Sequence, residues 1–178
     1  MSRLPNPDRR PPAGPLPSLG IYPAELSRNI RVDSVSRLDP ATPLAVNADD
    51  SVADAVVVLR QGNAGCLLVT DFGRVVGLFT ERDLLTRVLA PGRPLESPVR
   101  AVMTPDPVAV SPKDSVRTAI RRMQKGGYRN LPVVDETGRP VGVLSASRVV
   151  HYLVEHFPAI VFNQPPEPNA YPASPEGA

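Results

Sequence analysis

The chain contains one pattern of hydrophobic and polar positions twice. In the first copy, two short β-branched runs flank a turn at residues 71–73, and an apolar run at helical spacing, residues 84–89, follows the stretch 77–83. β-branched runs beside a turn predict paired strands, and helical spacing predicts a helix. We therefore expect strand, turn, strand and a helix that begins near Thr80. Residues 131–153 repeat this order, so internal repetition sets the expected architecture.

The segments upstream of these two stretches also match. Residues 43–55 align with residues 107–119 without a gap. Ser51 lies three residues before Asp54, which is a capping-box pattern at a helix start, and Ser115 occupies the matching position. We expect two helices that turn the following apolar residues to the core: Val52, Ala55, Val56 and Leu59 in the first, and Val116, Ala119, Ile120 and Met123 in the second.

The fold that this order predicts is α+β, with two β-α-β-β-α repeats. A unit of about 60 residues buries too little surface to be stable alone, so we expect the repeats to pack together. More than half of the 23 prolines lie in residues 1–23 and 158–178, which we expect to be extended or disordered tails. Between these tails we expect the first repeat at 30–90, a linker at 91–98 and the second repeat at 99–157.

Composition and charge exclude several classes of function. The net charge is +2 and aromatic residues make up 4%, so we do not expect nucleic-acid binding. The densest basic cluster, Arg117, Arg121 and Arg122, is interpreted as a solvated helix face. No run reaches the roughly 18 apolar residues of a membrane helix. The single cysteine, Cys66, has no disulfide partner within the chain and is expected to be a small buried side chain, which favours a soluble cytoplasmic protein.

The sequence carries no set of residues that would support catalysis or a metal site. The two histidines, His151 and His156, lie five residues apart on a predicted helix, which puts them on different faces. With one cysteine and no third ligand nearby, we expect no zinc site. A nucleophile elbow, a phosphate-binding loop and a dinucleotide glycine fingerprint are all absent. We therefore expect a protein that is not an enzyme.

Thr80 and Asp83 admit two interpretations. A threonine followed three residues later by an acid is an ordinary helix cap. The same place also offers a hydroxyl and backbone amides to a phosphate group. A carboxylate there can accept two hydrogen bonds from the vicinal diol of a ribose. The residue types alone leave both a helix cap and a nucleoside-phosphate site open.

The duplicated unit, with the stretch 77–83 in one copy and the stretch 128–135 in the other, resembles a tandem pair of cystathionine-β-synthase (CBS) domains, also called a Bateman module. The resemblance covers about residues 30–156. It implies two repeats related by a pseudo-twofold axis, with two clefts between them. In the family these clefts bind adenosyl ligands such as AMP, ADP, ATP or S-adenosylmethionine, and the modules commonly form homodimers.

The resemblance assigns Asp83 to the ribose hydroxyls and Thr80 to the ribose or a phosphate. Arg129 suits a phosphate because its planar guanidinium donates two hydrogen bonds, although a solvated surface arginine is the alternative. The nucleotide-binding residues that we expect are Leu78, Thr80, Arg82, Asp83, Tyr128 and Arg129.

The second copy departs from the family pattern, because Arg148 stands where the first copy has Asp83. An arginine cannot accept hydrogen bonds from a ribose diol, and a cation at a helix start costs about 0.3–1 kcal/mol. Either the second cleft binds no nucleoside, or it holds an anion at Ser145 and Arg148. We predict one nucleotide site per chain, at Asp83.

The predicted function is that of a non-catalytic regulatory module. It would bind an adenosyl nucleotide between the repeats and signal to a protein partner, which the sequence does not identify, or by oligomerisation as a homodimer. The alternative is a structural or interaction scaffold with vestigial ligand clefts, which the arginine at position 148 and the proline-rich ends favour.

Overall fold

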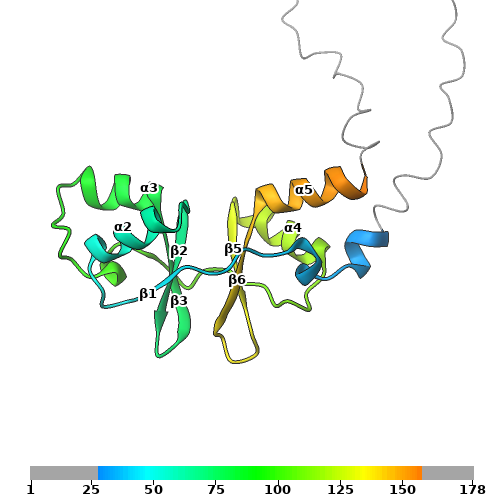
Figure 1. Cartoon of the computed structure of the whole chain (residues 1–178), viewed down its shortest axis with the longest axis horizontal. Helices are drawn as coiled ribbons and strands as arrows, with labels where there is room; N and C mark the ends of the chain where they lie inside the picture. The colour runs from blue at the N-terminus through cyan, green and yellow to red at the C-terminus, as the bar shows by residue number, and fades with distance from the viewer. Residues whose placement is uncertain (1–27, 158–178) are drawn as a thin grey trace, which may run out of the picture.

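A computed structural model describes residues 28–157, and the two predicted proline-rich tails lie outside the described residues. The described residues form two lobes of strands and helices that lie side by side (Figure 1). In both lobes the helices lie at the top of this view and a β-hairpin points downward. The predicted α+β fold of two repeats is confirmed.

The elements follow the predicted order in both repeats. The first lobe contains β1 (Ala45–Asn47), α2 (Val52–Gln61), β2 (Cys66–Asp71), β3 (Arg74–Thr80) and α3 (Glu81–Asp83), which continues as the π-helical segment η2 (Leu84–Leu89). The second lobe contains α4 (Val116–Gly126), β5 (Asn130–Val134), β6 (Pro140–Ser145) and α5 (Ala146–His156). Residues 28–32 form a helical turn, and the remaining elements are the short 3₁₀ helices η1 (Val35–Leu38) and η3 (Val99–Ala101) and the strand β4 (Thr104–Pro105).

The helices begin where the sequence predicts. Ser51 and Asp54 form a capping box at the start of α2, and Thr80 and Asp83 form one at the start of α3. Serine side chains also accept a backbone hydrogen bond at the starts of α4 and α5. One difference is that the helix after Asp83 continues in π-helical rather than α-helical form.

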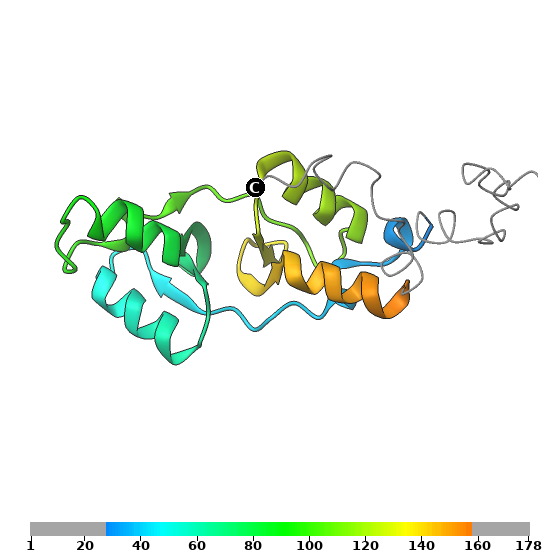
Figure 2. The ribbon, with the colours of Figure 1, turned by 90° about the horizontal axis from the view of Figure 1, so that it is seen from above.

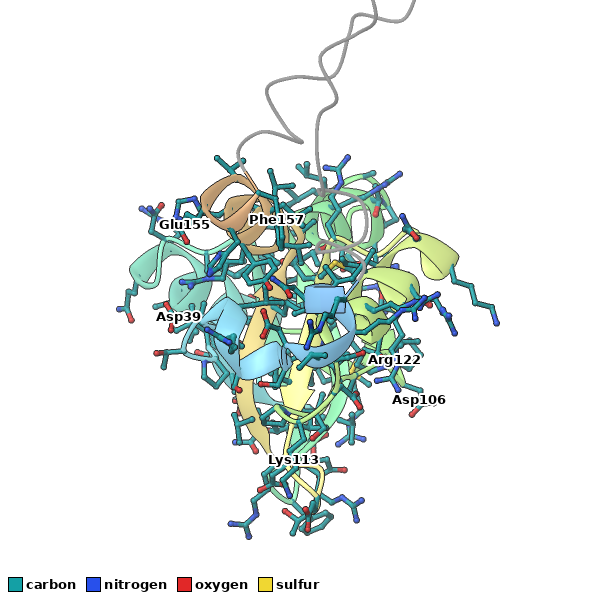
Figure 3. The ribbon with its side chains drawn as sticks, turned by 90° about the vertical axis from the view of Figure 1, so that its right-hand side faces the viewer. Asp39, Asp106, Lys113, Arg122, Glu155 and Phe157 are labelled. Atoms are coloured by element: carbon teal, nitrogen blue, oxygen red, sulfur yellow. The ribbon has the colours of Figure 1, made fainter. Side chains whose placement is uncertain are left out.

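Each sheet pairs with the segment that leads into the other lobe, through a strand in the first lobe and through an isolated bridge in the second. The first sheet has the order β1-β2-β3-β4, and β4 follows the linker between the repeats. In the second lobe β5 pairs with β6, and Ala41, which precedes β1, bridges to Val143 of β6. We name residues 39–44 the first crossover segment and residues 103–108 the second. Figure 2 shows the two connections between the lobes running along opposite sides, and Figure 3 places Asp39 and Asp106 on opposite sides of the molecule.

Two equivalent hydrogen bonds reflect the pseudo-twofold symmetry between the repeats. The Val35 amide donates to the Asp114 carbonyl at 2.8 Å, and the matching Val99 amide donates to the Asp50 carbonyl at 2.9 Å. As a result η1 packs on the second lobe and η3 on the first. This exchange was not predicted, because it joins segments that are far apart in the sequence and leaves no local pattern.

Each lobe has its own hydrophobic core, and a third cluster joins the lobes. Phe79 in the first core and Leu144 in the second are fully buried. Between the sheets, Leu68, Leu78 and Val143 pack together. All of the predicted core-facing residues of α2 and α4 are buried in the cores except Val56 and Ile120, which are half-buried against them.

Phe72 lies at the tip of the β2–β3 hairpin in an unfavourable conformation. Its side chain is 95% exposed and its φ is +47°, followed by Gly73 at +75°. A two-residue hairpin loop with two positive φ angles favours Asn and Gly, whereas a bulky residue there costs about 1–2 kcal/mol. We expect Phe72→Asn to raise the free energy of unfolding by about 1 kcal/mol in urea denaturation. Phe72→Ala keeps the backbone cost and should give less, so equal effects of the two variants would contradict this explanation.

Candidate functional site

One cleft of about 560 Å³ lies between the two repeats. Its walls come from the end of β3 and the start of α3, from the second crossover segment, and from the loop at residues 127–130 between α4 and β5. This volume is within the range of small-molecule sites. The structure brings together in this cleft all six residues that the sequence singled out: Leu78, Thr80, Arg82 and Asp83 from the first repeat, and Tyr128 and Arg129 from the second.

The Thr80–Asp83 pair is a complete capping box. Asp83 Oδ2 accepts hydrogen bonds from the Thr80 amide at 3.0 Å and from the Thr80 hydroxyl at 2.6 Å, and the Asp83 amide donates to Thr80 Oγ1 at 3.2 Å. Ser51 and Asp54 form the same box at 3.3, 2.6 and 3.1 Å, outside the cleft. The helix-cap interpretation is therefore correct for both pairs, and the box alone does not identify a ligand site.

Asp83 differs from Asp54 in its surroundings. Asp83 is 7% exposed and lines the cleft, whereas the capping box of Asp54 is exposed. Its second oxygen, Oδ1, lies 3.3 Å from Nε of Arg87. A carboxylate offers about four acceptor positions, so Asp83 can still accept from a ligand. The location in a cleft, rather than the cap, makes Asp83 a candidate ligand anchor.

Arg87 is a cleft residue that sequence reasoning missed. It follows Asp83 by four residues, a spacing that brings opposite charges together on one side of a helix and could have indicated the pair. Its Nη1 also donates to the carbonyl oxygens of Val102 at 3.1 Å and Met103 at 2.6 Å. No local pattern could have indicated these two contacts, because the carbonyls lie on a different segment of the chain.

The loop of the second repeat is held in position by two glycines. Gly127 ends α4 at φ +66°, and its amide donates to the Met123 carbonyl. A Cβ on Gly126 would lie 1.9 Å from Cε2 of Tyr128, so the tyrosine ring lies directly against this glycine. The Arg129 carbonyl accepts from the Ala146 amide at 2.8 Å, which joins the loop to the start of α5.

The cleft presents equal numbers of acidic and basic side chains. Within residues 28–157, neither the guanidinium of Arg82 nor that of Arg129 forms an ion pair, so both can meet an anionic group of a ligand. Asp106, in the second crossover segment, has φ +46°, and its amide donates to the Val76 carbonyl at 3.1 Å. The charged residues that line the cleft are Arg82, Arg87 and Arg129 with Glu81, Asp83 and Asp106.

Arg148, at the matching position of the second repeat, has an internal partner. Its Nη1 lies 2.9 Å from Oδ2 of Asp39 and also donates to the Asp39 carbonyl. Ser145 caps α5 by accepting from the Arg148 amide at 3.4 Å. At the possible anion site of Ser145 and Arg148, the arginine is thus paired with a carboxylate from the first crossover segment. The sequence could not show this, because Asp39 lies far away along the chain.

A second polar cavity, of about 610 Å³, lies along α5 beside Arg148. Its wall includes Tyr152, whose hydroxyl donates to Oδ2 of Asp33. Burial, and then the hydrogen bond to Asp33, raise the pKa of Tyr152 to about 12. Asp33 also pairs with Arg37 at 2.9 Å. These charges neutralise one another, so this cavity lacks the free cations of the first cleft.

Cys66, predicted to be buried, is half-buried, and burial raises the pKa of its thiol.

Among residues 28–157 no three side chains of His, Cys, Asp or Glu are grouped closely enough to hold a metal ion. In the same part of the chain, no helix has the length and apolar character that crossing a membrane requires.

The repeated fold agrees with comparisons to known proteins. The family model of the CBS domain matches residues 35–90 and again residues 99–155. The chain belongs to the CBS domain family. The resemblance noted from the sequence is therefore confirmed, and the two lobes are a pair of CBS domains.

Relatives of this CBS pair occur in very different proteins. The Meiotically up-regulated gene 70 protein of Schizosaccharomyces pombe is 41% identical over 104 residues, which are 58% of this chain and 14% of that protein. The CBS domain-containing protein YhcV of Bacillus subtilis is 31% identical over 56% of this chain and 71% of its own length. The CBS domain pair of protein MJ0100, solved with 5′-methylthioadenosine and S-adenosyl-L-methionine, has a TM-score of 0.63 at 22% identity, over 70% of this chain and 98% of that one.

Proposed function

We propose that the cleft at Asp83 binds an adenosyl ligand, namely AMP, ADP, ATP or S-adenosylmethionine, and that the chain is a non-catalytic regulatory module. Ligand binding would act as a signal, either by changing the interaction with a protein partner or by changing self-association of the chain. The observation that carries this proposal is the convergence in one cleft of a largely buried carboxylate, two arginines without ion pairs and an aromatic ring.

Each part of an adenosyl ligand has a suitable group in the cleft. The Asp83 carboxylate can accept hydrogen bonds from the two ribose hydroxyls, which are stronger because the acceptor is charged. The Tyr128 ring and the Leu78 side chain offer apolar surface to the base. Arg82 and Arg129 can meet a phosphate or a carboxylate. The fold can hold such a ligand, since the CBS pair of MJ0100 binds two adenosyl compounds, although at 22% identity that likeness concerns the fold alone.

The charge balance of the cleft favours some adenosyl ligands over others. Its three arginines face three carboxylates, so a ligand with many negative charges gains little net attraction. The Glu81 and Asp106 carboxylates would also repel a long phosphate chain. We therefore expect AMP, whose single phosphate carries about −2, and S-adenosylmethionine, which has no phosphate, to bind more tightly than ATP.

Calorimetric titration of the full chain tests this proposal. We would titrate AMP, ADP, ATP and S-adenosylmethionine at one ionic strength, with ribose 5-phosphate as the control that lacks the base. Saturable binding of AMP or S-adenosylmethionine at one site per chain, with weaker binding of ATP, is the expected result. If none of the four shows saturable binding, the scaffold with vestigial clefts becomes the better explanation.

The contact between Gly126 and the Tyr128 ring gives a specific prediction. Gly126→Ala forces the ring to move, but the ring is 40% exposed and alanine suits a helix, so stability should stay equal or rise by up to about 1 kcal/mol. Loss of ring packing against the base should lower the affinity for AMP by about threefold to tenfold in calorimetry. Tyr128→Ala should give the same loss, and the double variant no more. A further loss in the double variant would mean that Gly126 acts in another way.

We also propose that the chain forms a homodimer through the last helices of its two repeats. Leu85 and Leu89 of η2 and Val150 of α5 are more than half exposed, and Leu85 and Val150 occupy matching positions in the two repeats. Exposed apolar residues on matched helices fit a symmetric interface. Sedimentation equilibrium should give twice the 19.1 kDa mass of one chain, and Leu85→Glu should shift the equilibrium to the monomer. A monomer at all concentrations would exclude the homodimer.

A further inference from the structure

Arg87 joins the candidate ligand anchor to the second crossover segment. Its Nε lies 3.3 Å from Asp83 Oδ1, and its Nη1 donates to the Val102 and Met103 carbonyls at 3.1 and 2.6 Å. One guanidinium therefore contacts a carboxylate that lines the cleft and two backbone carbonyls where the second crossover segment begins. That segment forms another wall of the same cleft.

The segment that Arg87 holds also forms part of the cleft. Val102 is buried in the first core, and a Cβ on Gly77 would lie 2.2 Å from Sδ of Met103, so the Met103 side chain packs directly on β3. The next two residues form β4, in which Thr104 pairs with Leu78, and both of these residues line the cleft. A shift at the Met103 carbonyl would therefore reach the cleft wall within one residue.

The other crossover segment carries a matching contact. Asp39 occupies the position that matches Met103, and its carbonyl accepts a hydrogen bond from Arg148. In both repeats an arginine of the last helix thus binds the carbonyl at the same position of a crossover segment. The two arginines do not occupy matching positions in the repeats. Arg148 matches Asp83, whereas Arg87 lies one helical turn after Asp83. In the first repeat the carboxylate beside the arginine is Asp83 of the same helix, whereas in the second repeat it is Asp39 of the first crossover segment.

We propose that Arg87 is a positioning residue that couples Asp83 to the second crossover segment. This inference rests on the proposed adenosyl site, but the coupling itself exists in the free protein. Arg87 orients the Asp83 carboxylate, and the carboxylate in turn holds the guanidinium on the Val102 and Met103 carbonyls. A ligand over Asp83 excludes water from the ion pair, which strengthens it and tightens the crossover segment. The crossover segment thereby gives cleft occupancy a route into the second repeat in addition to the direct contacts of Tyr128 and Arg129.

Hydrogen exchange in the free protein tests the coupling without any ligand. The probes are the amides of Met103 and Asp106, which donate to the Val99 and Val76 carbonyls at 2.9 and 3.1 Å. We expect Arg87→Gln to speed their exchange about tenfold, as for the loss of one charged hydrogen bond, and Asp83→Asn to speed it less. The double variant should exchange no faster than Arg87→Gln alone. Additive effects of the two substitutions would overturn the coupling.

The same measurement with AMP tests the link to the ligand, with Arg37→Gln as the matched control. Arg37 pairs with Asp33 at 2.9 Å with the same four-residue spacing as Arg87 and Asp83, and it does not line the Asp83 cleft. AMP should slow exchange at Met103 and Asp106 in the wild type and in Arg37→Gln but not in Arg87→Gln. An Arg87→Gln variant that is less stable, yet keeps both its AMP affinity and the AMP-induced slowing, would reduce Arg87 to a structural role and overturn the inference. If the wild type binds neither AMP nor S-adenosylmethionine, the proposed function fails, while non-additive exchange in the free protein still supports the coupling.

Discussion

Replacing Asp83 with alanine should lower the affinity for AMP or S-adenosylmethionine by about 100-fold or more. The variant loses two hydrogen bonds from the ribose hydroxyls to a charged acceptor, each contributing about 1.5–3 kcal/mol. It also loses a helix cap, which should lower the free energy of unfolding by about 1 kcal/mol. Calorimetric titration and urea denaturation measure the two effects separately.

Asp54→Ala is the matched control for this prediction. Asp54 belongs to a capping box with nearly the same distances, at the start of α2 and outside the cleft. Its loss should lower stability by the same amount and leave ligand affinity unchanged. If Asp83→Ala and Asp54→Ala both lose only stability, Asp83 is a helix cap and the ligand, if one binds, is held elsewhere.

Phe79→Ala should lower the free energy of unfolding by about 3–5 kcal/mol. Phe79 is fully buried in the first core, between the two β3 residues, Leu78 and Thr80, that line the cleft. Truncation removes apolar contacts and leaves a cavity under this strand. Because small domains have only about 5–15 kcal/mol of stability in total, the variant should unfold at a much lower urea concentration.

Phe72→Ala provides the control for Phe79→Ala, since it removes the same side chain from a site that is 95% exposed. It should change stability by less than about 0.5 kcal/mol, because the side chain is exposed and alanine keeps the backbone cost of the positive φ. Phe79→Leu, which keeps most of the volume, should cost under about 1.5 kcal/mol. A loss below 1.5 kcal/mol for Phe79→Ala would show that the core around β3 collapses to fill the cavity.

Much of the fold could be predicted because its signals are local. The helix starts at Ser51 and Thr80 and the core faces of α2 and α4 depend on residues within a few positions of one another. The repeat could be predicted because these local patterns recur in the second half of the chain. The six candidate ligand residues were named from a family resemblance, and the structure places them in one cleft. Their roles toward a ligand remain predictions.

The rest could not be predicted because it depends on contacts between distant segments. The exchange of crossover segments pairs Ala41 with Val143 and β4 with β3, and neither pairing leaves a pattern in the chain. For the same reason the sequence did not indicate the partner of Arg148. Asp39 reaches Arg148 only because the first crossover segment lies beside α5 in the fold. The function of the second cleft was left open from the sequence, and the structure shows the Arg148–Asp39 ion pair at the position where the first cleft has Asp83.

The most direct test of the central claim is the chemical-shift change of backbone amides on titration with AMP and, separately, with S-adenosylmethionine. The account predicts saturable changes in residues 78–83, 104–108 and 127–130, which form the walls of the Asp83 cleft. It predicts little change at residues 39–41 and at Ser147 and Arg148, where Asp39 pairs with Arg148. The Ala146 amide is left out of this comparison because it donates to the carbonyl of the cleft residue Arg129. Saturable changes confined to residues 39–41, Ser147 and Arg148, or no saturable change with either ligand, would contradict the account.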